Sequence, residues 1–458
     1  MADKPEKPPK RLKDANTLGG RMRRYASTTV SLGGFAAKAA VNRALGREMD
    51  MAKSASELRA ALGGLKGPVM KVAQLLATVP DLLPPEFAEE LATLQSSAPP
   101  MGWPFVRRRM AAELGPDWLT RFTRFDQEAS AAASLGQVHR AVTKDGAEVA
   151  CKLQYPDMAS AVEADLGQLD LAFAIFRRAE KAIDAEDMKG EIAARLREEL
   201  DYALEARHIA LYRQILADKP EISVPDVIAK LSTQRLLTMG WLEGKRLLDF
   251  KGDTQDRRNA IAANMFTAWW LPFVRFGAIH GDPHLGNYTV RDDLGINLLD
   301  YGCIRTFSPS FVGGVIGLYR GLLANDRAAQ VAAYETWGFK KLSNELIDTL
   351  NIWARFIYAP LLDDRVRTIA DGVSPAQYGR KEAFEVHSRL KTLGPVKPPR
   401  EFVFMDRAAI GLGAVFLHLG AELNFYRLFN DAMGDFSEAA LAKRQRKVFA
   451  AAGVSLPA

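Results

Sequence analysis

The most constraining stretch of the sequence carries two acids and an amide on neighbouring backbone. It runs from residue 279 to 302 and reads I-H-G-D-P-H-L-G-N-Y-T-V-R-D-D-L-G-I-N-L-L-D-Y-G. A polar, glycine-containing turn at 292–295 separates two short apolar runs, which predicts a hairpin. Such a hairpin brings Asp282, Asn287 and Asp300 close together, which limits the folds that can surround it.

This set of side chains suits phosphoryl transfer. One carboxylate orients the accepting hydroxyl or water, and hard oxygen ligands hold the Mg²⁺ that bridges the nucleotide phosphates. The spacing D-x4-N followed by D-x-G is similar to the catalytic and metal-binding loops of the protein-kinase-like superfamily. That resemblance implies that Asp282 is the catalytic acid, that Asn287 and Asp300 hold metal, and that His280 supports the loop. Aminoglycoside and choline phosphotransferases share H-G-D-x4-N, so the motif indicates no substrate; a polar hairpin that satisfies only its own backbone is the alternative.

Composition and charge limit the class of protein. The 458 residues are 48% hydrophobic and 25% charged, as in ordinary globular proteins with two or three domains. No apolar run is long enough to span a membrane, and the start M-A-D-K-P-E-K-P-P-K lacks a signal region, so export is not expected. The two cysteines, Cys151 and Cys303, favour a reducing compartment. We therefore expect a cytoplasmic protein, either free or held peripherally at the inner membrane.

The net charge of +6 is concentrated at the N-terminus. Residues 1–24 contain eight Lys or Arg and three acids, whereas the remaining chain contains 53 basic and 52 acidic residues. A basic tail on a nearly neutral body favours attraction to anionic membrane lipid over a nucleic-acid groove. A disordered solubilising tail is the alternative, and we expect no nucleic-acid partner.

The region before the hairpin has the pattern of a small sheet. Strands are predicted over 138–142, 149–153, 224–228 and 235–241, with a turn at 144–146 between the first two. The segment A-A-A-S-L-G-Q stands where a kinase carries its glycine-rich phosphate loop, and Lys152 in V-A-C-K-L stands where a lysine pairs with the α- and β-phosphates. Residues 239–244 would form a hinge. The predicted nucleotide-binding residues are Ala131, Ala132, Ala133, Ser134, Gly136, Gln137, Lys152, Met239, Trp241 and Leu242.

Helical periodicity dominates elsewhere. Helices are predicted over 55–76, 85–95, 105–114, 158–183 and 191–216, and throughout the chain after residue 241 apart from the hairpin. Asp201 and Glu205 are four residues apart and share a helical face, from which Glu205 could pair with Lys152. A run of solvent-facing acids is the alternative. Lys71 and Gln74 also share a face, from which they could reach a common acidic or phosphate partner.

Together these motifs resemble the UbiB/AarF/ADCK family of atypical protein-kinase-like proteins. The resemblance rests on A-A-A-S-L-G-Q-V-H, V-A-C-K-L-Q-Y-P, E-E-L-D-Y-A-L-E-A, H-G-D-P-H-L-G-N and D-Y-G, with K-V-A-Q upstream. It implies an α+β, protein-kinase-like bilobal fold with a small antiparallel-sheet N-lobe, a mainly helical C-lobe and an added N-terminal helical cover. In that cover Lys71 and Gln74 would meet Glu199 and Asp201, and Lys152 would pair with Glu205 in the nucleotide site.

The resemblance also implies a function. ATP and Mg²⁺ would be the cofactors, and ATP hydrolysis would support ubiquinone (polyprenyl-quinone) biosynthesis at the membrane surface. The implied partners are anionic membrane lipid, an isoprenoid or phenolic small molecule, and proteins of quinone biosynthesis. A phosphotransferase acting on a small hydroxyl compound and an ATP-gated module that binds a lipid or partner both stay open.

Three residues depart from the family pattern. Ala73 replaces a glycine of the cover motif; because alanine fits a helix better by about 1 kcal/mol, we expect the cover to survive. Tyr301 replaces the phenylalanine of D-F-G, and Gly240 replaces a hinge acid. The predicted division of the chain is a basic tail (1–24), a helical extension with the cover (25–105), an N-lobe with a helical insert (106–240) and a helical C-lobe (241–458).

Overall fold

The computed structural model of the protein describes residues 101–457, with gaps at 164–192 and 394–399 and short breaks at 134, 157, 159, 161, 195, 341, 371 and 375–377. Several predictions therefore lie outside the described residues. They are the tail, nearly all of the helical extension, most of the predicted helix 158–183, and the residues Lys71, Ala73, Gln74 and Ser134.

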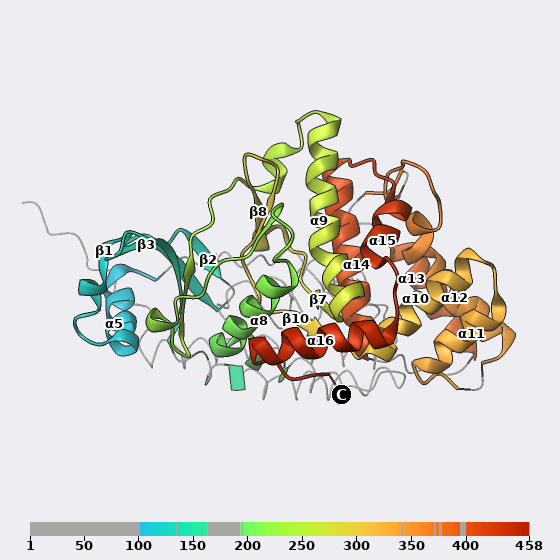
Figure 1. Cartoon of the computed structure of the whole chain (residues 1–458), viewed down its shortest axis with the longest axis horizontal. Helices are drawn as coiled ribbons and strands as arrows, with labels where there is room; N and C mark the ends of the chain where they lie inside the picture. The colour runs from blue at the N-terminus through green and yellow to red at the C-terminus, as the bar shows by residue number, and fades with distance from the viewer. Residues whose placement is uncertain are drawn as a thin grey trace, which may run out of the picture.

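An antiparallel sheet and one helix form a small lobe at the left of Figure 1. The helix is α5 (Trp103–Leu114), close to its predicted bounds. The five strands are β1 (Phe122–Phe125), β2 (Ala131–Ala133), β3 (Gly136–Thr143), β4 (Glu148–Gln154) and β6 (Leu236–Gly240). They run in the order β1-β3-β4-β6, and β2 also pairs with β3. The predicted turn between β3 and β4 is present, with Gly146 at a φ of 86°.

The two faces of this sheet have different surroundings. In β4, Val149, Cys151 and Leu153 belong to a hydrophobic cluster with α5. Lys152 lies between them in sequence, so its side chain points to the opposite face. It stands beside Val138 of β3 and Leu237 of β6 in the sheet register. That face is turned towards the rest of the molecule, because Leu237 and its neighbours belong to the main hydrophobic core.

Two predictions around the sheet were wrong. The helix predicted over 191–216 is interrupted at residues 200 and 201, and α8 (Tyr202–Ile215) begins only after Asp201. Asp201 is the N-cap of α8, with its side chain accepting a hydrogen bond from the Leu204 amide at 2.9 Å. The strand predicted over 224–228 is absent apart from one bridge between Val227 and Met239, with β5 (Ile222–Ser223) lying before it. Pro225 lies inside this run and has no amide hydrogen to donate to a ladder.

The predicted hairpin is present as β8 (Tyr288–Val290) and β9 (Ile296–Leu298), and β5 pairs in parallel with β9. A further pair joins β7 (Ala278–His280) to β10 (Ile304–Thr306). β10 corrects the prediction that the chain after the hairpin is entirely helical. The β7–β10 pair places the segments before and after the hairpin against one another.

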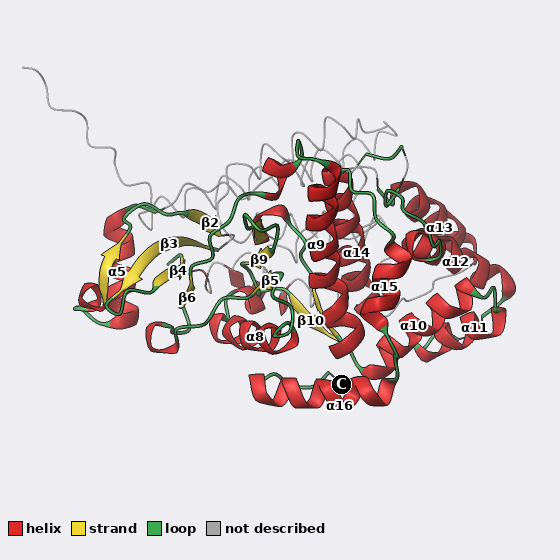
Figure 2. Ribbon diagram, turned by 45° about the horizontal axis from the view of Figure 1, so that its top comes forward, coloured by secondary structure: helices red, strands yellow, loops and turns green. Residues whose placement is uncertain are grey.

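A helical lobe forms the other end of the molecule (Figures 1 and 2). Its helices are α9 (Gln255–Phe276), α10 (Pro309–Leu323), α11 (Arg327–Thr336), α12 (Asn344–Tyr358), α13 (Arg380–Leu393), α14 (Arg400–Leu419), α15 (Phe425–Met433) and α16 (Glu438–Ala452). Short 3₁₀ turns are η1 (Trp118–Arg121), η2 (Ala229–Leu231), η3 (Leu247–Phe250), η4 (Leu285–Asn287) and η5 (Ala359–Leu361). Trp269 and Phe273 of α9 are fully buried in the core, and α9 ends at Gly277 with a left-handed φ of 63°.

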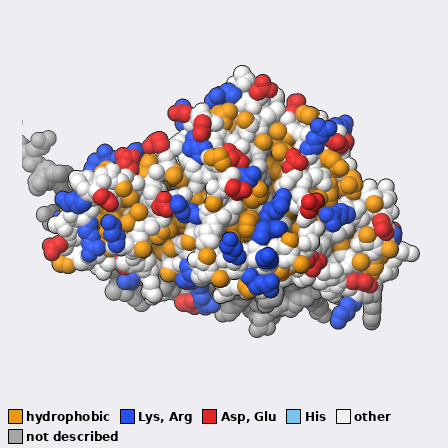
Figure 3. Space-filling view, in the orientation of Figure 1, with side chains coloured by type: hydrophobic (Ala, Val, Ile, Leu, Met, Phe, Trp, Pro, Cys, Tyr) orange, Lys and Arg blue, Asp and Glu red, His pale blue; other side chains and the backbone are white. Residues whose placement is uncertain are grey.

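The described part of the chain thus confirms the predicted sheet lobe and mainly helical lobe. None of its helices is long and apolar enough to cross a membrane. Acidic and basic side chains are interspersed over the face drawn in Figure 3. This agrees with the nearly balanced charge of the sequence after residue 24.

Candidate active site

Lys152 is held between two carboxylates. Its Nζ donates to Glu205 Oε1 at 2.7 Å and to Asp300 Oδ2 at 2.9 Å. The Glu205 side chain is only 3% exposed, whereas that of Asp300 is 33% exposed. The predicted pair of Lys152 with Glu205 is therefore present, and the same lysine connects β4 and α8 to the end of the hairpin.

The residue after Asp300 fixes this arrangement from the other side. The Tyr301 amide donates to Glu205 Oε1 at 3.3 Å, and its carbonyl accepts a hydrogen bond from His208 Nδ1 at 3.0 Å. The Tyr301 ring is fully buried, and its hydroxyl donates to the Leu298 carbonyl at 3.2 Å. Tyrosine therefore fits this position, because the buried hydroxyl has a hydrogen-bond partner.

His280 joins the catalytic and metal loops. Its Nδ1 accepts from the Asp282 amide at 3.2 Å, so the neutral ring carries its proton on Nε2. Nε2 donates to the Asp300 carbonyl at 2.7 Å. Burial lowers the pKa of His280, which keeps the ring neutral. These hydrogen bonds are the contacts that the predicted supporting role of His280 requires.

The other two polar residues of the hairpin also lie near this point. Asn287 Nδ2 donates to the Asp282 carbonyl at 3.0 Å, and the Asn287 carbonyl accepts from the Leu299 amide at 2.9 Å. Asn287 and Asp300 thus flank the two ends of the β8–β9 hairpin. Because its Nδ2 is directed to the backbone, the Asn287 side chain keeps its oxygen as an available acceptor.

Asp282 has a partner that the motifs do not contain. Arg407 of α14 donates from Nη2 to Asp282 Oδ1 at 3.1 Å, and both side chains are partly exposed, at 23% and 21%. The two residues are separated by 125 positions in the chain. No sequence spacing indicates this pair, because it depends on the packing of α14 beside β7.

Lys152 and its neighbouring carboxylates shift one another's pKa values. Burial alone would lower the pKa of Lys152, but the charges of Asp300 and Glu205 outweigh burial and raise it well above its ordinary value. Burial alone would raise the pKa of Asp300, but its ion pair and hydrogen bond with Lys152 hold that pKa well below the usual range. Lys152 is therefore a cation and Asp300 an anion at neutral pH.

The alanine-rich segment, which precedes Lys152 in the sequence, forms the hairpin between β2 and β3. β2 pairs with β3 through Ala131–Val138, Ala132–Gln137 and Ala133–Gly136. A Cβ on Gly136 would clash with the Leu153 carbonyl oxygen, so β3 approaches β4 too closely here for any side chain. Glycine at this position is thus required by the packing of the sheet.

Gln137 does not lie where its predicted role requires. Its amide clamps the backbone of Met101, accepting from the nitrogen at 2.7 Å and donating to the carbonyl at 3.1 Å. Its Nε2 also lies 2.8 Å from His139 Nε2, and both side chains are fully buried. Because Gln137 pairs with Leu153, it faces α5, on the side of the sheet opposite Lys152. We therefore remove Gln137 from the nucleotide-binding residues.

The predicted hinge, residues 239–244, begins in the last two residues of β6 and continues after it. Met239 is 5% exposed and stands beside Ala150 in the register, on the Lys152 face. The Arg140 guanidinium lies 4.7 Å from the centre of the Trp241 ring, and Leu242 is half-buried. The alternation of β4 could have identified further apolar residues on the Lys152 face, since they lie at even offsets or in register with it. These are Val138, Ala150 and Leu237.

The structure describes both acids that were predicted to meet the cover, Glu199 and Asp201. Glu199 is half-buried, and its charge contributes to raising the pKa of Arg407, although burial of that guanidinium acts in the opposite direction. Asp201 is exposed and caps α8. Their predicted partners Lys71 and Gln74 lie outside the described residues, so that contact stays a prediction.

The donor set fits a hard cation such as Mg²⁺. Asp300 offers carboxylate oxygen and Asn287 offers amide oxygen, both of which Mg²⁺ accepts. Within the described residues, no group of three or more His, Cys, Asp or Glu could by itself hold a metal ion. A Mg²⁺ held by Asn287 and Asp300 would therefore need further oxygen ligands from phosphates and water, as is usual for this ion.

Comparisons with known proteins agree with this geometry. The family described as "ABC1 atypical kinase-like domain" matches residues 93–334. The chain is 31% identical over 381 residues to the mitochondrial atypical kinase COQ8 of Saccharomyces cerevisiae, covering 80% of this chain and 74% of that protein. It is 31% identical over 326 residues to the chloroplastic protein ACTIVITY OF BC1 COMPLEX KINASE 3 of Arabidopsis thaliana, covering 68% of this chain but only 45% of that protein.

A solved structure has the same overall arrangement. The Rv3197 protein of Mycobacterium tuberculosis, in a complex with erythromycin, superimposes with a TM-score of 0.58 at 26% sequence identity. The match covers 86% of this chain and 98% of the mycobacterial chain. The likeness therefore extends beyond residue 334, where the family match ends, into the helical lobe that carries Arg407.

Proposed function

Because the chain belongs to the ABC1 atypical kinase-like family, which includes the COQ8 and ADCK proteins of the UbiB group, we propose that it binds Mg-ATP and hydrolyses it in support of ubiquinone (polyprenyl-quinone) biosynthesis at a membrane surface. The observation that carries the proposal is the position of Lys152, within 2.9 Å of both Glu205 and Asp300. A lysine held by a helix carboxylate beside an aspartate that can bind metal is the arrangement that protein kinases use for phosphoryl transfer.

The residues divide the work as follows. Lys152, positioned by Glu205, binds the α- and β-phosphates as a permanent cation. Asn287 and Asp300 would hold Mg²⁺, which would neutralise negative charge on the nucleotide phosphates. Asp282 accepts a hydrogen bond from the attacking water or hydroxyl, and Arg407 keeps the Asp282 carboxylate oriented for that task. The side chains of Val138, Ala150, Leu237 and Met239 offer an apolar surface to the adenine.

The attacking group decides between hydrolysis and transfer. Water gives an ATPase, whereas a phenolic or isoprenoid hydroxyl gives a small-molecule phosphotransferase. We favour water in the absence of such a substrate, with anionic lipid as the stimulating surface. The basic residues 1–24 are the part of the chain suited to that lipid.

The test follows the γ-phosphoryl group of labelled ATP, with Mg²⁺ and with or without vesicles of anionic lipid. We expect free labelled phosphate, more of it with vesicles, and none from Asp300→Asn. Asp292→Asn is the matched control, because Asp292 lies in the same hairpin with its side chain 89% exposed and contacts only Lys245 in the described residues.

Other outcomes contradict the proposal in distinct ways. Label on a metabolite or protein would make the protein a transferase. Tight nucleotide binding without turnover, together with retained cellular function of Asp282→Asn, would make it an ATP-gated binding module.

A further inference from the structure

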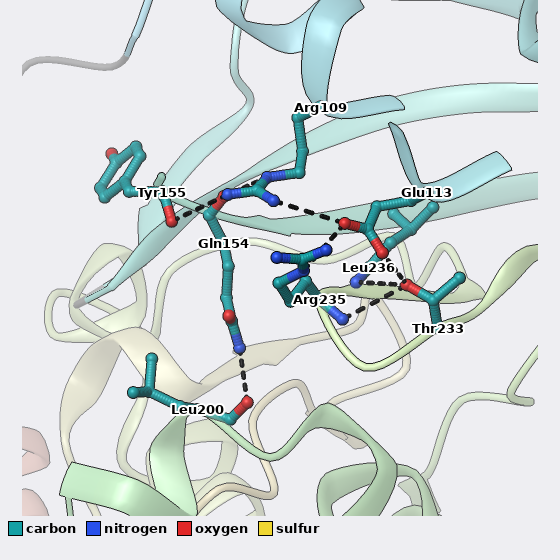
Figure 4. A network of polar contacts seen from close by, with 8 residues as sticks. All are labelled: Arg109, Glu113, Gln154, Tyr155, Leu200, Thr233, Arg235 and Leu236. Atoms are coloured by element: carbon teal, nitrogen blue, oxygen red, sulfur yellow. Dashed lines mark hydrogen bonds and ion pairs between the residues drawn. The ribbon is translucent and has the colours of Figure 1, made fainter. Parts of the chain in front are cut away.

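A buried polar network ties the end of β4 to α5 and to the segment before α8 (Figure 4). None of its residues has a role in the site described above. The members are Arg109, Glu113, Gln154, Tyr155, Leu200, Thr233, Arg235 and Leu236. The network begins two residues after Lys152, so it bears directly on the geometry of the Lys152 site.

Gln154 is the residue that reaches α8. It lies two positions after Lys152 in β4, so both side chains leave the same face of the sheet. Its side chain is buried, and Nε2 donates to the Leu200 carbonyl at 2.6 Å. Leu200 comes immediately before Asp201, the N-cap of α8. One strand therefore contacts the start of α8 at two points, through Gln154 at Leu200 just before the helix and through Lys152 at Glu205 in its first turn.

Arg109 holds the same end of β4 from α5. Its Nε donates to the Gln154 carbonyl at 3.2 Å, and its Nη2 donates to the Tyr155 carbonyl at 3.2 Å. The Arg109 side chain is 9% exposed and its partner Glu113 is 6% exposed. The two planar N–H groups of one guanidinium on successive carbonyls fix the direction of the strand end.

Glu113 completes the network at the start of β6. It accepts from Arg109 Nη1 at 3.3 Å and from Thr233 Oγ1 at 2.7 Å, and it pairs with Arg235 Nε at 3.0 Å. The backbone N–H of Gln154 in turn donates to the Arg235 carbonyl at 3.1 Å. The strand end is thus braced by both neighbouring elements, and the side-chain amide of Gln154 extends from it to the segment before α8.

We propose that Gln154 is a positioning residue, which keeps α8 against β4 and so keeps Glu205 within reach of Lys152, while Arg109 fixes the strand end from which Gln154 acts. A neutral amide suits this task because it holds the backbone without competing for the carboxylates that Lys152 needs. The role in turnover rests on the proposed ATPase function, whereas the role in holding α8 does not.

The chain offers a matched control for a purely structural role. Gln445 of α16 is also buried, and its Nε2 donates to the Phe276 and Phe307 carbonyls at 3.0 and 2.8 Å. It lies in the helical lobe, on the C-terminal helix of the fold (Figure 1). Gln445→Leu therefore removes the same kind of buried amide contact from α16, which also packs against α8, and leaves the Gln154–Leu200 hydrogen bond in place.

The first measurement is hydrogen exchange of the α8 amides in the full chain, without nucleotide. We expect Gln154→Leu to speed exchange at the start of α8 at least tenfold relative to its C-terminal half, and Gln445→Leu to leave that ratio unchanged. Unchanged exchange in Gln154→Leu would overturn the positioning role, whether or not the protein hydrolyses ATP.

The second measurement is a double-mutant cycle on Mg-ADP affinity and on kcat/KM for ATP. Gln154→Leu should lower both at least tenfold in the wild-type background and less than threefold in the Glu205→Gln background, since it acts through Glu205. Arg109→Lys, which keeps the charge beside Glu113, should follow the same dependence with a smaller loss, and it serves if Gln154→Leu folds poorly. Equal losses in both backgrounds would overturn the proposal. A wild-type protein that neither binds nor hydrolyses ATP would overturn the proposed function alone.

Discussion

Replacing Lys152 with methionine tests the electrostatics of the site most directly. The substitution leaves the Glu205 carboxylate, 3% exposed, without its cation. Asp300 is 33% exposed and stays hydrated, so the main cost falls on Glu205. Removing one partner of a buried ion pair typically costs about 3–5 kcal/mol.

Protonation sets an upper limit to that cost. Without Lys152, Glu205 can bind a proton instead of staying charged. The free energy of protonation at pH 7 is about 1.36 kcal/mol for each pH unit above the ordinary Glu pKa, and roughly 2.7 units give about 3.7 kcal/mol. At pH 5.5 the same limit is about 1.6 kcal/mol. Burial already raises the pKa of Glu205 in the wild type, and loss of the Lys152 cation raises it further, so the folded variant binds more protons than the folded wild type. The variant therefore recovers stability relative to wild type as the pH falls.

The assay is thermal unfolding of Lys152→Met, Glu205→Gln and the double variant at pH 7 and pH 5.5, without nucleotide. At roughly 2 °C per kcal/mol for a large domain, we expect Lys152→Met to unfold about 7 °C below wild type at pH 7 and about 3 °C below it at pH 5.5. The double variant has no unpaired buried carboxylate, so it should lie closer to wild type and show the same difference at both pH values. A deficit of Lys152→Met that stays constant or grows at pH 5.5 would refute this account of the site.

Three further predictions follow from single contacts. Arg407→Met should lower kcat for ATP about ten- to hundredfold while KM changes less than threefold, because Arg407 donates to Asp282 and, in the described part of the chain, to no proposed nucleotide-binding residue; a matching rise in KM would contradict this. Burial lowers the pKa of His208 to about 4, so between pH 6.5 and 5 the unfolded chain binds a proton that the folded chain does not. The free energy of unfolding of the wild type should therefore fall by roughly 1.5 kcal/mol over this range because of His208. His208→Gln should lack that fall in urea titrations at the two pH values. Gly136→Ala should lower the unfolding temperature and weaken Mg-ADP binding, since its Cβ would meet the Leu153 carbonyl, whereas Gly252→Ala, with nothing within 4 Å, should do neither.

Local chemistry in the sequence determined much of this protein. The glycine-containing turn and alternating apolar residues identified β3, β4 and the β8–β9 hairpin, because side-chain alternation and turn geometry are properties of adjacent residues. The same hairpin predicted that Asp282, Asn287 and Asp300 lie close together. The pairing of Lys152 with Glu205 followed from the order of motifs, and the contact between them is present.

The tertiary structure determined the contacts that depend on how distant helices and strands pack together. Gln137 follows the alanine-rich segment, but the packing of α5 on one side of the sheet turns its amide to Met101 instead of the Lys152 face. The break at residues 200 and 201 makes Asp201 the N-cap of α8, and the Leu200 carbonyl at this break accepts a hydrogen bond from Gln154 of a distant strand. Arg407 reaches Asp282 only because α14 packs beside β7. These contacts join residues tens to more than a hundred positions apart, and no local periodicity can encode them.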